Sequence, residues 1–164
     1  MELNLRQQSL SYLQPAVITA QNQEETAECI VPDSSPDIER VLETCGMVLL
    51  RGKECREGSC TVSGSVRAWV VYLAEKESTP RRLELTIPFS ARMEHPSLTP
   101  QSEICFSACL RSLDTRVVNP RKVSVRAGMS VQTSGWSAAE LPYCSGADGE
   151  EALQCRVESR RLTI

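Results

Sequence analysis

Residues 31–42 read Val31-Pro32-Asp33-Ser34-Ser35-Pro36-Asp37-Ile38-Glu39-Arg40-Val41-Leu42. Proline has no backbone N–H and holds φ near the value of a first helical turn, so we predict a helix that begins at Pro36 with Ser35 as its N-cap. Asp37 and Glu39 would place negative charge at the positive end of the helix dipole. The apolar residues recur at helical spacing: Ile38, Val41 and Leu42. The stretch therefore predicts one short helix, near residues 36–44, between two β regions.

Outside this stretch the apolar residues recur with a period of two, which is typical of half-buried strands. The clearest strand face lies within residues 59–74: Val62, Gly64, Val66, Ala68, Val70 and Tyr72. A second face covers residues 83–89, and Pro88 should end this strand or place it at a sheet edge. Two more faces lie on either side of the turn sequence Asn119-Pro120-Arg121-Lys122. Residues 16–31 have a polar middle and suggest two short strands around a turn.

Consecutive hairpins with one short helix predict an all-β, mainly antiparallel fold, either a β-sandwich or an open barrel. We divide the 164 residues into an N-terminal arm or edge strand (1–14), a β domain (15–145), and a linker with a C-terminal strand (146–164). The sequence of Leu153–Ser159 can be aligned with that of Leu3–Ser9, and the match is either a coincidence or the remnant of a repeat. The last strand then either completes the domain or begins a second repeat, and an unpaired strand can pair with another copy.

The composition is that of a globular protein, with 41% hydrophobic residues and a net charge of −3 from 18 basic and 21 acidic side chains. This balance gives no preference for nucleic acid or membranes. The first residues lack the pattern of a signal peptide, and the longest apolar run is too short to span a bilayer. We therefore expect a cytoplasmic protein without membrane insertion.

Eight cysteines are the unusual feature of the composition. In a secreted chain an even number would suggest disulfides, but in a reducing compartment we expect reduced, mostly buried thiols that act as small apolar side chains. No C-x-x-C pair occurs, so the spacing does not favour structural zinc and we predict no metal and no cofactor. The cysteines stand at these positions: Cys29, Cys45, Cys55, Cys60, Cys105, Cys109, Cys144 and Cys155.

Glu57-Gly58 reads as a two-residue hairpin turn, because glycine tolerates the positive φ that such turns require. Arg56 would then face Ser59, and Cys55 would lie opposite Cys60 at a position where cross-strand side chains come closest. Two interpretations of this pair remain open. The thiols form a cross-strand disulfide, or they stay reduced in a reducing compartment.

Catalytic constellations are not apparent. His95 is the only histidine and precedes a proline in a loop, and no phosphate-binding glycine pattern occurs. Asp33 and Asp37 could act as a carboxylate pair, but helix capping and first-turn charge explain them more simply. A basic cluster lies around the last hairpin and reads as a solvated face or as a rim that meets an acidic partner: Arg111, Arg116, Arg121, Lys122 and Arg126.

The stretch of residues 31–42 resembles the P-D-x-x-P-D-I-x-x-I/V-L signature of the SPOCS domain family, the repeated module of SipL-type spore-envelope morphogenesis proteins in endospore-forming bacteria. The segments Val62–Tyr72 and Ile87-Pro88-Phe89-Ser90 resemble later segments of the family in the same order. The resemblance covers residues 15–135, and nothing in the chain resembles the LysM domain of longer relatives. The signature residues, for which a structural role is expected, are Pro32, Asp33, Pro36, Asp37, Ile38, Val41 and Leu42.

The resemblance implies a non-enzymatic structural module of the spore coat or envelope that acts by protein–protein association at the forming spore surface, in the mother-cell cytoplasm. Its expected partners are other envelope proteins or a second copy, and not nucleic acid. One rival hypothesis is a β module that binds glycan or another small molecule on exposed Trp69 or Trp136. Another is a cysteine-based enzyme, which needs a thiol with a lowered pKa.

Overall fold

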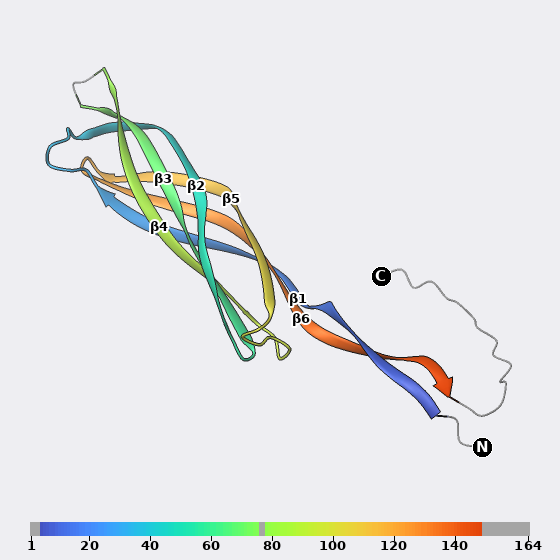
Figure 1. The fold of residues 1–164 in the computed structure, drawn as a ribbon. Coiled ribbons are helices and arrows are strands. Elements are labelled where there is room, and N and C mark those ends of the chain that lie inside the picture. Colours follow the sequence, from blue (N-terminus) through green and yellow to red (C-terminus); the bar gives the residue numbers. More distant parts are fainter. Residues whose placement is uncertain (1–3, 76–77, 149–164) are drawn as a thin grey trace. The chain divides into compact units, whose positions relative to one another are not determined.

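The computed structural model describes residues 4–75 and 78–148, which form six strands and no helix (Figure 1). The all-β fold class predicted from the sequence is thereby confirmed. The strands in chain order are β1 (Asn4–Ile30), β2 (Ile38–Arg56), β3 (Ser59–Ala74), β4 (Pro80–Glu94), β5 (Glu103–Asn119) and β6 (Lys122–Asp148).

The chain divides into two compact units, residues 14–137 and residues 1–13 with 138–164. We call residues 14–137 the sandwich unit. The described residues of the other, 4–13 and 138–148, are called the ribbon unit. Strands β1 and β6 are long enough to contribute to both units.

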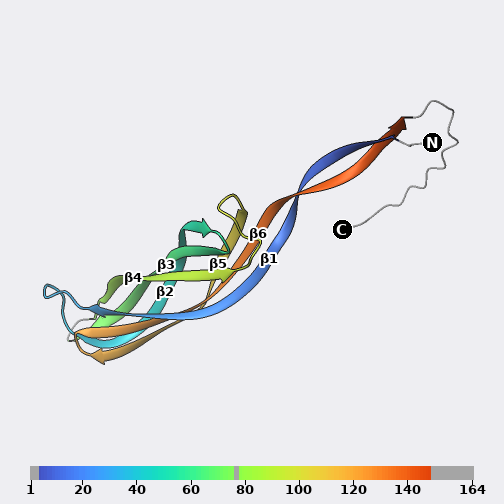
Figure 2. The ribbon, with the colours of Figure 1, turned by 90° about the horizontal axis from the view of Figure 1, so that it is seen from below.

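The sandwich unit contains two antiparallel three-stranded sheets, with strand orders β1-β6-β5 and β2-β3-β4. Figures 1 and 2 show these sheets as two layers that are not closed into a barrel. Alternate residues of the central strands point between the layers. All the residues expected on the inward face of β3 are buried, and so are the inward residues of β6: Val123, Val125, Ala127, Met129 and Val131.

The buried side chains form two clusters. The larger one combines the inward faces of β3, β4 and β6 with Val31 and Ile38 at the ends of β1 and β2. The smaller one contains Cys60, Met93, Leu98 and Ile104. Pro88 lies within β4, which continues to Glu94, and β4 is an edge strand as the proline requires.

The hairpin between β2 and β3 has the predicted register. Arg56 pairs with Ser59 and Cys55 pairs with Cys60, and Gly58 has a φ of 73°. The second predicted turn is also present, because Asn119 pairs with Lys122 across Pro120 and Arg121. Local turn chemistry was sufficient to predict both hairpins.

The helix predicted near residues 36–44 is wrong. This segment is the beginning of β2 and pairs with β3 from Ile38↔Ala74 onward. Register shifts between Ile38 and Arg40 and between Val41 and Glu43 interrupt the alternation of a regular strand. The bulge between Ile38 and Arg40 places Ile38 and Val41, three positions apart, on the same inward face of β2. Ile38 is buried, Val41 is half-buried, and Leu42 is 46% exposed.

The two short strands predicted within residues 16–31 are also wrong, because this segment belongs to the single strand β1. Its polar middle is accommodated at a sheet edge, where inward side chains can reach polar partners. Gln21 Nε2 donates to the carbonyl of Arg92 at 2.9 Å, and Gln23 Nε2 lies 4.0 Å from Met129 Sδ.

The ribbon unit consists of the first part of β1 and the last part of β6. Side-chain hydrogen bonds between them include Ser9 Oγ to Glu140 Oε2 at 3.0 Å, Tyr143 Oη to Gln8 Oε1 at 2.7 Å, and Ser145 Oγ to the Arg6 carbonyl at 3.3 Å. Residues 146–148, predicted to lie in a linker, belong to β6. The predicted C-terminal strand, including Leu153–Ser159, lies outside the described residues. In the described part of the chain no helix has the length and apolar character needed to cross a bilayer.

Candidate functional site

The loop between β1 and β2 crosses from one sheet of the sandwich unit to the other. Within it, the Ser35 N–H donates to the Pro32 carbonyl at 2.8 Å and closes a tight turn. Both ends of the loop are fastened to the β5–β6 turn: the Val31 N–H donates to the Arg121 carbonyl at 2.9 Å, and the Ile38 N–H donates to the Pro120 carbonyl at 2.7 Å. The loop and the turn therefore form one hydrogen-bonded unit.

The guanidinium group of Arg121 fills the concave side of this loop. Nη1 donates to Asp37 Oδ1 at 2.6 Å and lies 3.5 Å from the Ser35 carbonyl. Nη2 has three acceptors: the carbonyls of Val31 at 3.1 Å and Pro32 at 3.0 Å, and Asp33 Oδ1 at 3.3 Å. We call Arg121 and residues 31–37 the arginine clasp. Its geometry exploits the planar, five-donor fork of arginine, which lysine lacks.

The far side of the loop is fastened to the other sheet. The Glu75 N–H donates to the Asp37 carbonyl at 2.9 Å, and Tyr72 Oη lies 3.5 Å from the Pro36 carbonyl. Tyr72 itself is fully buried in the larger core cluster. The clasp thus connects the ends of both sheets, and the arrangement of its atoms is that of a structural fastening.

The structure brings part of the predicted signature together. Asp33 and Asp37 both contact Arg121, and Ile38 anchors the loop in the core. The carboxylate of Asp37 does not act at a helix N-terminus, because it forms an ion pair with Arg121 instead. Asp33 is fully exposed, while the side chains of Asp37 and Arg121 are 39% and 37% exposed. Leu42 lies outside the clasp on β2.

Sequence reasoning placed Arg121 in a basic cluster and missed its role. The only local signal was an arginine at the inner position of a turn, and its acceptors lie more than eighty residues earlier in the chain. Two other members of the cluster contact carboxylates of β1, Lys122 with Glu28 at 2.5 Å and Arg126 with Glu24 at 3.5 Å. The cluster is therefore partly neutralised within the chain.

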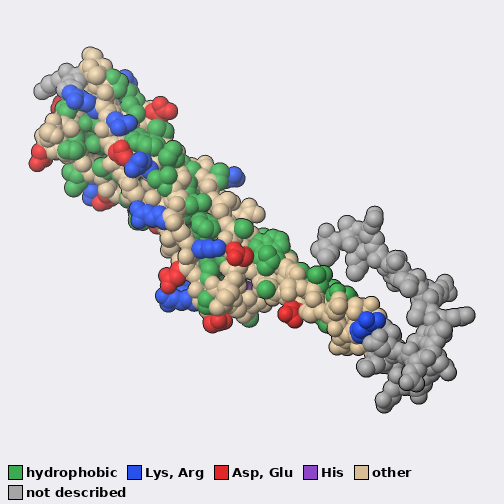
Figure 3. All heavy atoms as spheres, viewed as in Figure 1, with side chains coloured by type: hydrophobic (Ala, Val, Ile, Leu, Met, Phe, Trp, Pro, Cys, Tyr) green, Lys and Arg blue, Asp and Glu red, His purple; other side chains and the backbone are tan. Residues whose placement is uncertain are grey.

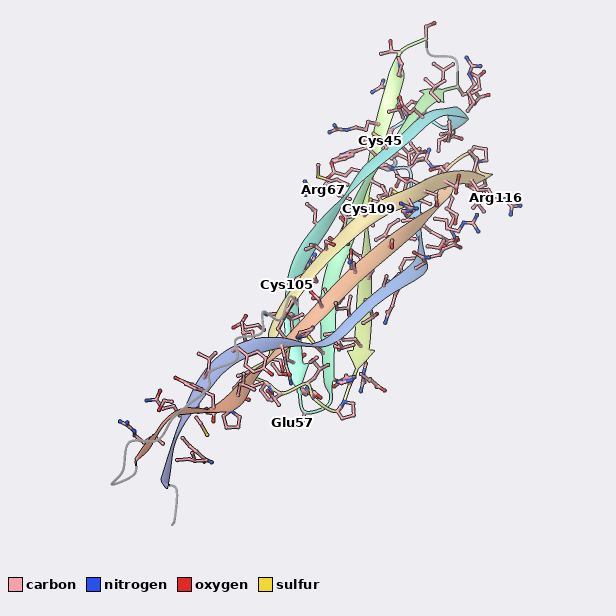
Figure 4. The ribbon with its side chains drawn as sticks, turned by 90° about the vertical axis from the view of Figure 1, so that its right-hand side faces the viewer. Cys45, Glu57, Arg67, Cys105, Cys109 and Arg116 are labelled. Carbon is pink, nitrogen blue, oxygen red and sulfur yellow. The ribbon has the colours of Figure 1, made fainter. Side chains whose placement is uncertain are left out.

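The cysteines differ from the prediction that most are buried. Of the seven described, only Cys60 is fully buried, while Cys29 and Cys55 are half-buried. Burial raises the pKa of the Cys29 thiol. The remaining four are exposed: Cys45, Cys105 and Cys109, which are labelled in Figure 4, lie on β2 and β5, and Cys144 lies in the ribbon unit. Cys155 lies outside the described residues.

Cys55 and Cys60 form a pair of neighbouring thiols. Their Sγ atoms are 2.9 Å apart across the β2–β3 hairpin, and both are thiols. Burial, and to a smaller extent the hydrogen bond and the charge of Cys55, raise the pKa of Cys60 to about 12 against an opposing effect from Lys53. Lys53 Nζ donates to the Ile104 carbonyl at 3.1 Å.

Other candidate groups are not organised for chemistry. The His95 N–H donates to the Gly58 carbonyl at 3.0 Å, and its Nδ1 accepts from the Ser97 N–H at 3.3 Å, so this residue shapes a turn. Among the residues that the structure describes, no three metal-ligating side chains lie close enough together for a metal ion. Trp69 and Trp136 are half-buried. One surface hollow has a volume of about 460 Å³, and its lining, which includes Gln23, Arg111 and Met129, contains neither tryptophan.

No model of a known protein family, no curated protein and no solved structure matches this chain.

Proposed function

We propose that this chain is a non-enzymatic structural module that acts by protein–protein association in the assembly of a spore coat or envelope. The observation that carries the proposal is the surface of the ribbon unit. Figure 3 shows hydrophobic side chains at the surface of this ribbon. Its large exposed hydrophobic residues are Leu5, Leu10, Tyr12, Leu13, Leu141 and Tyr143.

Four of these side chains share one face. Leu10 and Tyr12 alternate with polar residues along β1 and therefore point the same way as Gln8. The hydrogen bond from Tyr143 to Gln8 places Tyr143 on that face, together with Leu141 two positions before it. We call this set the ribbon face: Leu10, Tyr12, Leu141 and Tyr143. Each of these residues is between 41% and 56% exposed.

A two-stranded ribbon with this surface is unfavourable alone in water. Such ribbons are at best marginally stable without a third strand or a packed layer, and clustered exposed apolar side chains mark interaction sites. In the part of the chain that the structure describes, β6 beyond Trp136 has no partner on the side where β5 pairs with it earlier. This free edge can accept a strand of another envelope protein or of a second copy, while the ribbon face is covered.

The assignment to spore assembly rests on the resemblance of residues 31–42 to the SPOCS signature. The arginine clasp supports a structural role for that signature, because its acidic and proline residues fasten a loop. We accordingly propose a location at the forming spore surface, in the mother-cell cytoplasm, with envelope proteins or the chain itself as partners.

The experiment compares three single variants of the full chain by sedimentation velocity over a wide concentration range. Leu10→Lys and Tyr143→Lys place charge on the ribbon face and should weaken self-association or capture of envelope proteins by at least about tenfold, since each buries a charge in the contact. Ser11→Lys lies on the same strand but points to the opposite face, and it should leave association unchanged. A wild-type chain that stays monomeric and is diffuse in sporulating cells would contradict the proposal.

A further inference from the structure

Cys55 and Cys60 form the second pair beyond the two-residue turn of the β2–β3 hairpin, after Arg56 and Ser59. In such hairpins the pair next to the turn is hydrogen-bonded and the following one is not, and Cα atoms of non-hydrogen-bonded pairs are about 4.5 Å apart. Disulfides require Cα separations of about 4.4–6.8 Å. The register of the hairpin therefore suits a disulfide at this pair, and the two Sγ atoms are already 2.9 Å apart.

The environments of the two thiols differ. Cys60 is only 1% exposed and packs in the smaller core cluster with Met93, Leu98 and Ile104. Cys55 is half-buried at the border of the same cluster and is accessible to small solutes. One thiol can therefore meet an external reagent, while the other is reached only through its partner.

We propose that Cys55 and Cys60 form a redox site that exchanges electrons with low-molecular-weight disulfides and closes as a cross-strand disulfide. In the first step the Cys55 thiolate attacks one sulfur of the small disulfide, whose S–S bond breaks and releases one thiolate. In the second step Cys60 loses its proton to solvent and attacks Cys55 Sγ, which releases the second thiolate. The two cysteines lose two electrons, and the small disulfide gains them and two protons to become two thiols.

The charges around Cys60 support this order of events. In the dithiol form, the hydrogen bond and the charge of Cys55 contribute to the raised pKa of Cys60. Both contributions disappear once Cys55 carries the mixed disulfide, whereas Lys53 still acts to lower the pKa of Cys60. Modification of Cys55 therefore prepares Cys60 for the second step.

The disulfide would lie next to the β2–β3 turn, which is already hydrogen-bonded to the loop between β4 and β5. The Gly58 N–H donates to the Leu98 carbonyl at 2.9 Å, and the Gly58 carbonyl accepts from the His95 N–H. Oxidation links the two strands that lead into this turn, and it should raise the midpoint of thermal unfolding in a way that reductant reverses. This site is separate from the ribbon face and does not depend on the proposed association.

The test uses the reduced full chain incubated with oxidised glutathione, followed by trypsin digestion without reduction and mass spectrometry. Trypsin cleaves after Lys53, Arg56 and Arg67. A bond between Cys55 and Cys60 would therefore link the peptide 54–56 to the peptide 57–67. We expect this linked peptide in the wild type and its complete loss in Cys55→Ser, which alters the half-buried member of the pair and spares the core.

Cys105 and Cys109 provide the matched control. They are four positions apart on one face of β5, about 13 Å by the rise of a strand, and Figure 4 shows them separately along β5. They should each take up glutathione without joining. The proposal is overturned if Cys55 stops at the mixed disulfide, or if Cys55 and Cys60 remain free thiols when Cys105 is fully modified.

Discussion

Arg121 Nη1 lies 2.6 Å from Asp37 Oδ1, and the same guanidinium group also contacts the carbonyls of Val31 and Pro32. One side chain of the last hairpin thus holds the loop in which the chain passes between its two sheets. Exposed ion pairs alone contribute little to stability. Arg121 contributes more than an exposed ion pair, because its hydrogen bonds to backbone carbonyls fix the path of the loop.

Arg121→Ala should lower the free energy of unfolding by about 1–2 kcal/mol, since it removes the ion pair and several hydrogen bonds to a loop that water can partly rehydrate. Arg121→Lys should recover only part of this loss, because an ammonium group cannot reach all the acceptors at once. Urea unfolding measures both. Arg116→Ala is the control, because Arg116 is exposed at the end of β5 and has no carboxylate within ion-pair distance among the described residues (Figure 4). Equal losses for Arg121→Ala and Arg116→Ala would show that the clasp contributes nothing.

The two acidic residues of the clasp should differ. Asp37→Asn should cost about 1 kcal/mol, because Asp37 is partly covered and has the shortest contact with Arg121. Asp33→Asn should leave stability unchanged, because the Asp33 side chain is fully exposed and its contact with Arg121 is 3.3 Å. A double-mutant cycle with Arg121→Ala checks the assignment. If the Asp37 effect is the same with and without Arg121, the ion pair is not its cause.

The sequence predicted those features of the fold that depend on neighbouring residues. Period-two burial in β3 and β6 and both turns follow from local patterns, and the structure agrees. The helix prediction was wrong because bulges between Ile38 and Arg40 and between Val41 and Glu43 shift the inward positions of β2. Pairing with β3 outweighs the local helix signals. The contact between Arg121 and Asp37 joins residues 84 positions apart, and no local pattern encodes such a distance.

Gly64 is a site of close approach between neighbouring strands. It pairs with Phe89, and an added Cβ would lie 2.5 Å from Phe89 Cζ and 2.7 Å from the Leu49 carbonyl oxygen. Gly64→Ala should therefore reduce the free energy of unfolding by about 1–3 kcal/mol through displacement of the ring and the adjacent strand. Gly52→Ala is the control, because no heavy atom lies within 4 Å of its added Cβ, and its effect should stay within about 0.5 kcal/mol. Urea unfolding measures both variants. An equal decrease in the free energy of unfolding for both would show that the strands around Gly64 adjust to the added methyl group without a loss of stability.

Cys60 should make stability depend on pH under reducing conditions. Its pKa is raised by burial, and then by Cys55, from 9.0 to about 12 in the folded chain. Above pH 9.0 the unfolded chain releases this proton while the folded chain keeps it, so the contribution of Cys60 is complete below pH 9.0 and is lost as the pH rises toward about 12.

The measurement is urea unfolding of the wild type and Cys60→Ala, with reductant, at about pH 8 and about pH 11. Comparing the two proteins separates the effect of Cys60 from the titration of lysines and tyrosines, which both proteins share. The wild type should be the more stable protein at the lower pH, since Cys60 fills space in the smaller core cluster. Its advantage should shrink at the higher pH, by at most about 1.4 kcal/mol per pH unit for one proton. An advantage that is equal at both pH values would show that Cys60 ionises as readily in the folded chain as in the unfolded one.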